Sequence, residues 1–86
     1  MIIEDIFTIN RGVLVVGKPN KELFKLNDKV KIKGNNFEKE ATIVGLDIHP
    51  GCFGEFSLES VTMGLLLEGI DEKEIKKGYC LVKKSD

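Results

Sequence analysis

The chain has 86 residues and a formal net charge of -1, which allows one small domain and excludes a nucleotide-hydrolysing domain joined to another. The near balance of charge also excludes a strongly basic nucleic-acid binder. Residues 1–39 nevertheless hold eight of the thirteen basic side chains, and residues 40–74 hold eight acids against one base, Lys73. This asymmetry predicts no partner by itself, because sequence separation does not fix spatial separation.

No apolar run approaches the ~18–20 residues that cross a bilayer, and the N-terminal residues lack the positive charge of a secretion signal. We therefore expect a cytoplasmic protein that makes no membrane contact. Cys52 and Cys80 form no CxxC motif, and two thiols with one histidine are too few for a closed zinc site. Free thiols in a reducing compartment are expected, with a disulfide between them as the alternative.

Short apolar stretches of period two, separated by Gly, Asn, Asp and Pro, predict strands and turns. A first strand is expected at residues 2–9 and a second at 13–16, joined as a hairpin. Alternation at residues 29–33 predicts a half-buried strand with valine and isoleucine on one face. Its other face carries Lys29, Lys31 and Lys33. A row of lysines is suited to contacting the phosphates of an RNA backbone. The alternative interpretation is that lysines along a strand keep a sheet edge soluble.

A long strand is expected at residues 40–48, and Gly45 within it predicts a bulge or a barrel corner. Residues 49–54 form a loop with the strongest turn signal of the chain, which makes it the best place for a site. His49 and Cys52 lie in this loop. A nucleophilic cysteine needs a base and an orienting partner in place, so we expect no catalytic residue here.

A further strand is expected at residues 64–69, and a closing strand at 79–82. Between them, one helical turn is expected at 70–78, with Asp71 as its cap and Gly78 at its end. Six to seven short strands with one helical turn predict an all-β fold. We expect a small closed or nearly closed antiparallel β-barrel, because closure removes the sheet edges that a small domain cannot otherwise cover.

Four blocks of sequence support this expectation. Residues 7–17 read FTINRGVLVVG, residues 24–30 read FKLNDKV, residues 42–49 read TIVGLDIH, and residues 64–81 contain GLLLEGI and EIKKGYCL. In this order they resemble the β-barrel that forms the second domain of translation GTPases such as elongation factor Tu. Asn27 stands where glycine is usual, and asparagine tolerates the left-handed conformation. The resemblance covers nearly all of the single domain expected over residues 1–86.

The resemblance implies a non-catalytic module that binds RNA, either tRNA or ribosomal RNA, or a ribosome-associated component. The phosphate loop GxxxxGK[ST] is missing from the sequence, so no nucleotide and no other cofactor are expected. In the family's acceptor-end pocket, two positions correspond to Asp47 and Glu68, and Glu68 replaces an arginine, which reverses the charge. Arg11 matches the family's glycine-arginine-glycine loop. The candidate RNA contacts are Arg11, Lys29, Lys31 and Lys33.

Two other classes of function compete with this one. The first is a protein-interaction barrel that has lost RNA binding and docks a partner through its acidic residues Asp47, Glu55, Glu59 and Glu68. The charge reversal at Glu68 favours it. The second is an enzyme that uses His49 and Cys52, which the isolated pair supports weakly.

Overall fold

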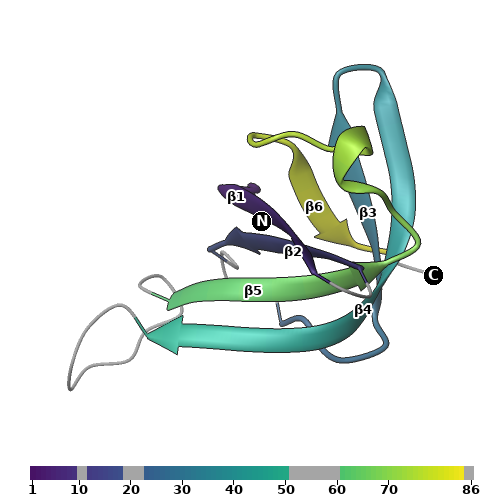
Figure 1. The fold of residues 1–86 in the computed structure, drawn as a ribbon. Helices are drawn as coiled ribbons and strands as arrows, with labels where there is room; N and C mark the ends of the chain where they lie inside the picture. Colours follow the sequence, from purple (N-terminus) through teal and green to yellow (C-terminus); the bar gives the residue numbers. More distant parts are fainter. Residues whose placement is uncertain (10–11, 19–22, 51–60, 85–86) are drawn as a thin grey trace.

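The computed structural model describes residues 1–9, 12–18, 23–50 and 61–84, which form an all-β structure (Figure 1). Its elements are β1 (Asp5–Ile9), β2 (Gly12–Gly17), β3 (Lys29–Gly34), β4 (Phe37–Pro50), β5 (Val61–Glu68), the 3-10 helix η2 (Glu72–Glu74) and β6 (Cys80–Lys83). All ladders are antiparallel, and the six strands form one sheet in the order β1-β2-β5-β4-β3-β6. The expected all-β class with one short helical turn is confirmed. Within the described ranges, no helix has the length and apolar character needed to cross a membrane.

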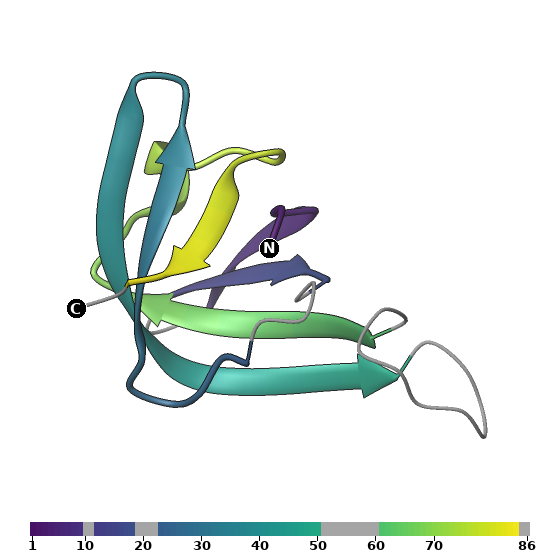
Figure 2. The ribbon, with the colours of Figure 1, turned by 180° about the vertical axis from the view of Figure 1, so that it is seen from behind.

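β4 belongs to two ladders and bends where it passes from one to the other. Its first part pairs with β3 and its second part with β5. Figure 2 shows it descending from the hairpin with β3 and then turning to run along β5. The register shifts between Ile43 and Gly45, so Val44 is an extra residue, and the bulge expected at Gly45 is confirmed. A Cβ on Gly45 would lie 3.0 Å from the Leu66 Cβ, which explains the missing side chain.

The hairpin of β4 and β5 is longer than the sequence indicates. His49 and Pro50, which were expected to begin a loop, pair with Thr62 and Val61. Pro50 is the last described residue of this ladder, and proline, which lacks a backbone donor, is tolerated at such a position. The remainder of the expected loop, residues 51–54, lies outside the described residues.

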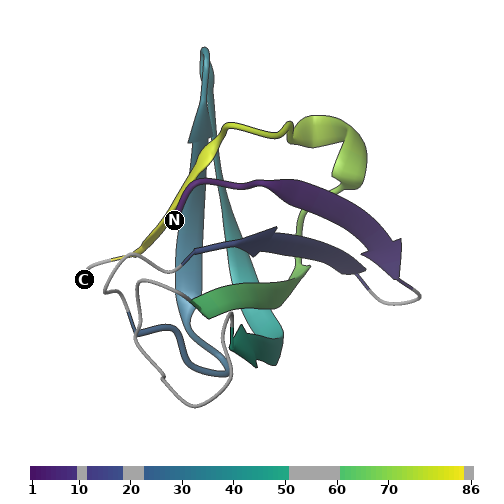
Figure 3. The ribbon, with the colours of Figure 1, turned by 90° about the vertical axis from the view of Figure 1, so that its left-hand side faces the viewer.

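β1 and β6 are the two ends of the sheet order, and no ladder joins them in the part of the chain that the structure describes. The residues before β1 do bond to the segment that enters β6. The Ile3 amide donates to the Tyr79 carbonyl at 2.9 Å, the Gly78 amide donates to the Ile3 carbonyl at 2.8 Å, and Ile2 forms an isolated bridge with Cys80. Figure 3 shows the N-terminal residues beside β6 and β1 running away from it. The described ladders therefore leave the sheet unclosed, and only the residues before β1 reach the segment that enters β6.

The core is filled by apolar side chains from alternate positions of the strands. Val30 and Ile32 are fully buried, as the alternation of β3 indicates. Val15 of β2 faces Leu65 of β5 in the ladder, and both are fully buried. The largest fully buried side chains are Ile3, Ile32, Ile43, Leu65, Leu67, Leu81, Val15 and Val30. Because these residues come from widely separated segments, the core forms only when the sheet has curled.

Two local features that the sequence indicates are also present. Asn27 has a φ of 72°, in the left-handed region, immediately before β3. Asp71 caps η2, because its carboxylate accepts from the Lys73 amide while the Glu74 carboxylate accepts from the Asp71 amide. η2 ends earlier than expected, at Glu74, and Gly78 takes its φ of 95° in the following turn.

The ring of Tyr79 covers Gly34, the last residue of β3. A Cβ on Gly34 would lie 2.4 Å from atoms of the Tyr79 ring, so no side chain fits between them. The ring also packs against Phe37, with 5.6 Å between ring centroids. An aromatic ring over a strand glycine replaces the packing that the glycine cannot supply. This contact ties the β3–β4 turn to the segment that enters β6.

We predict that Gly34→Ala lowers the free energy of unfolding by about 1–3 kcal/mol, because the added methyl displaces the ring. Urea denaturation measures this change. In a Tyr79→Ala background the same substitution should be neutral or stabilising, since the ring is gone and alanine is favoured over glycine in a strand by roughly 0.5–1 kcal/mol. An equal loss in both backgrounds would contradict the overlap.

Candidate functional site

The three predicted lysines of β3 lie on the outer face of the sheet. Lys29, Lys31 and Lys33 are opposite Thr42, Glu40 and Glu38 of β4, in that order. The Lys33 Nζ lies 3.8 Å from the Glu38 carboxylate. Lys29 and Lys31 form no ion pair with a described residue. The acids of β4 therefore neutralise part of the row, and Lys29 is the lysine of the row whose ladder partner, Thr42, is uncharged.

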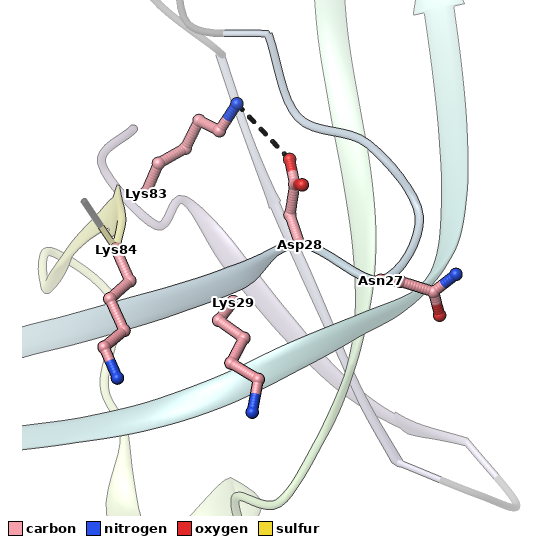
Figure 4. A pocket seen from close by; sticks show the side chains of 5 residues that line it. All are labelled: Asn27, Asp28, Lys29, Lys83 and Lys84. Atoms are coloured by element: carbon pink, nitrogen blue, oxygen red, sulfur yellow. Dashed lines mark ion pairs between the residues drawn. The ribbon is translucent and has the colours of Figure 1, made fainter. Parts of the chain in front are cut away.

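A pocket of about 450 Å³ opens beside Lys29, at the start of β3 and the end of β6 (Figure 4). Its lining residues are Asn27, Asp28, Lys29, Lys83 and Lys84. The Lys84 amide donates to the Lys29 carbonyl at 2.9 Å, which holds the two segments together. Three cations and one acid line the pocket, so its charge is positive.

The three ammonium groups of the pocket differ in their partners. The Lys83 Nζ lies 3.4 Å from the Asp28 carboxylate and donates to the Leu23 carbonyl at 2.8 Å. The Lys84 Nζ lies 3.0 Å from the Glu40 carboxylate. Figure 4 shows Lys83 reaching toward Asp28, whereas Lys29 and Lys84 extend together to the opposite side. Lys29 of β3 and Lys84, the residue after β6, can therefore approach one anion, such as a phosphate group, from adjacent segments.

The carboxylates next to these lysines are held in their charged form. The Lys25 amide donates to the Asp28 carboxylate at 2.9 Å, and this bond, aided by Lys83, lowers the pKa of Asp28. The hydrogen bond from Lys84 lowers the pKa of Glu40. Both acids are therefore charged at neutral pH and pair with their lysines.

Glu68 lies near Lys29, whereas Asp47 lies elsewhere on the sheet. Glu68 is opposite Thr42, and a second pocket of about 220 Å³ is lined by both Glu68 and Lys29. Asp47 is opposite Gly64, which lies four residues from Glu68 along β5, or about 13 Å at the rise of a strand. The structure thus brings Glu68 to the lysine face and leaves Asp47 at a separate position of the β4–β5 ladder.

The remaining residues named from the sequence are four that lie outside the described residues and Cys80, which lies within them. Arg11, Cys52, Glu55 and Glu59 lie outside the described residues. Cys80 is a half-buried free thiol in β6. Among the described residues, no group of three or more His, Cys, Asp or Glu side chains is arranged to hold a metal ion.

Lys83 and Lys84 are site residues that the sequence analysis missed. Their only signal is a pair of adjacent lysines after the last expected strand, a pattern that is common on protein surfaces. Their place beside Lys29 follows from the pairing of β3 with β6, which sets Val30 opposite Lys83. A scan of the chain against models of known protein families finds no match. The chemistry of the site is therefore argued from its own residues.

Stability is expected to fall in acid. The pKa values of Asp28, Glu40 and Glu74 are lowered in the folded protein, in Glu74 chiefly by the hydrogen bond from Lys39. A lowered pKa stabilises the folded state above the ordinary pKa and loses that effect as the pH falls through the folded value. The melting temperature should therefore drop as the pH falls below about 4.5.

In Glu40→Gln this drop should be smaller by about 1–3 °C, because an exposed ion pair contributes little. Thermal melts between about pH 7 and pH 3 measure it. Glu72→Gln is the matched control, since the Glu72 carboxylate makes no ion pair with a described residue. An identical acid profile for wild type and Glu40→Gln would contradict the role of the Glu40–Lys84 pair.

Proposed function

We propose that this chain is a non-catalytic module that binds the phosphate backbone of RNA, built on a β-barrel like that of the second domain of translation GTPases. The observation that carries the proposal is the positive pocket at β3 and β6, where Lys29 and Lys84 extend to the same side. Ammonium groups on neighbouring strands suit phosphates spaced along a nucleic-acid strand.

The barrel part of the proposal is supported by the bonds between residues 1–3 and the entry to β6, which bring the ends of the sheet order together. The family part is supported by the positions of three of the four sequence blocks. The second block places Asn27 in the left-handed turn before β3, and the third places Gly45 at the bulge of β4. The fourth, residues 64–81, spans most of β5, η2 and the start of β6.

The acids on the same face limit which RNA the module binds. Glu38, Glu40 and Glu68 lie beside the lysines and repel phosphate from most of the β3–β4 surface. We expect attraction at the pocket of β3 and β6, where the lining residues are three lysines and one acid. We expect a short contact with one or two phosphates, and binding of modest affinity that decreases with salt.

We predict that Lys29→Gln weakens binding of a single-stranded oligouridine about fivefold to tenfold at about 50 mM salt. The substitution removes a phosphate contact and breaks no ion pair with a described residue, so the fold is retained. The slope of the logarithm of the binding constant against the logarithm of salt should become less negative by about 0.7. Fluorescence anisotropy of a labelled RNA of about 20 nucleotides, titrated at several salt concentrations, measures both quantities.

Lys77→Gln is the matched control. Its charge change is the same, but the Lys77 Nζ lies 3.1 Å from the Asp5 carboxylate of β1, outside the positive pocket. Equal weakening by Lys29→Gln and Lys77→Gln would indicate a response to net charge alone and would exclude a site at β3 and β6. No binding by the wild-type protein at low salt would exclude RNA as the ligand.

A further inference from the structure

Residues of three neighbouring strands form a row of different polar groups on the outer face of the sheet. Lys29 of β3 is opposite Thr42 of β4, and Thr42 is also opposite Glu68 of β5. Opposite residues of antiparallel strands have their Cα atoms about 4.5–5.5 Å apart, so roughly 10 Å separates the Cα atoms of Lys29 and Glu68. An ammonium group, a hydroxyl group and a carboxylate therefore follow one another across the sheet.

The pocket of about 220 Å³ described above lies along this row. Its lining residues are Lys29, Glu40, Ala41, Thr42, Glu68 and Gly69. Lys29 also lines the larger lysine pocket at β3 and β6, so the two pockets share this residue. Sites for drug-sized ligands have about 300–1,000 Å³, so the smaller pocket suits one sugar or one base rather than a longer segment.

The charged groups of the smaller pocket differ in their existing partners. The Glu40 carboxylate lies 3.0 Å from the Lys84 Nζ, so it is already paired. Lys29 and Glu68 are both exposed, and neither makes an ion pair with a described residue. A ligand that fits both presents an anionic group to Lys29 and an uncharged hydrogen-bond donor to Glu68.

One nucleotide of an RNA strand has this combination of groups. Its phosphate carries the negative charge, and the ribose attached to that phosphate carries an uncharged 2′-hydroxyl that can donate a hydrogen bond. Carboxylates accept from a ribose 2′-hydroxyl in the same way in dinucleotide-binding folds. A DNA strand lacks this hydroxyl, so it would leave the Glu68 carboxylate without the donor.

We propose that the Glu68 carboxylate accepts a hydrogen bond from the ribose 2′-hydroxyl of the nucleotide whose phosphate contacts Lys29, and that this bond selects RNA over DNA. The inference rests on the proposed RNA binding and names the residue that distinguishes the sugar. Glu68 lowers the attraction of this face for phosphate, because like charges repel. In return it supplies selectivity for the sugar that the phosphate carries.

Oligouridine and oligodeoxyuridine of equal length test the inference, because the second strand lacks only the 2′-hydroxyl. Fluorescence anisotropy at about 50 mM salt gives the dissociation constant of each labelled strand. We expect the wild-type protein to bind oligouridine about threefold to tenfold more tightly than oligodeoxyuridine. In Glu68→Ala this ratio should fall to about one, because the acceptor is gone. The lost negative charge raises the affinity for both strands alike, so the ratio isolates the hydrogen bond.

Glu72→Ala is the matched control, since Glu72 is exposed and lines neither of the two pockets. It removes the same charge and should leave the ratio of the two dissociation constants unchanged. Equal binding of both strands by the wild-type protein, or an unchanged ratio in Glu68→Ala, would overturn this inference and leave the proposed RNA binding intact. Binding of neither strand would overturn the proposed function together with the inference.

Discussion

The bend in β4 determines how the rest of the molecule is arranged, because this one strand supplies the partner for both β3 and β5. Without the bend, β4 would hold both ladders in one flat sheet, and the apolar face of that sheet would have nothing to pack against. The extra residue at Val44 changes the direction of the strand, and Gly45 lets Leu66 approach closely. The two halves of the sheet then face each other, which allows Ile43 and Leu67 to be buried with Val30 and Ile32. The core and the positions of the outer faces follow from this local irregularity.

The same strand controls the charge of the candidate site. Its first part sets glutamates opposite two lysines of β3, and only at Lys29 is the opposite residue an uncharged threonine. Positive charge consequently accumulates at the end of the sheet, where Lys83 of β6 and the next residue, Lys84, are added. At the β1 end of the sheet order, η2 brings Glu72 next to Thr8 and Ile9. A chain with almost no net charge thus gathers basic side chains at one place and acidic side chains at another.

Features set by neighbouring residues could be predicted from the sequence. Alternation is enough to orient Val30 and Ile32, Asn27 is tolerated in the left-handed turn, and Asp71 begins η2 as a cap. Features set by pairing between distant strands could not be predicted. Nothing local indicates that Lys84 bonds to Lys29 or that β1 remains an edge, since both depend on the strand order. The end of β4 was misplaced because Pro50 reads as a turn residue, although proline is tolerated at the end of a ladder.

The contact between the first residues and the entry to β6 has a kinetic consequence. The Met1 amino group donates to the Leu81 carbonyl, across a sequence separation of 80 residues. Closing a loop of this length costs conformational entropy that no local contact offsets, so this contact should form late in folding, after the β4–β5 and β3–β4 hairpins. In the native state it should also be the first contact to open. When the contact between residues 1–3 and β6 opens briefly, the central ladders persist. Amide hydrogens of residues 1–3 and of the start of β6 should therefore exchange with solvent faster than those of β5.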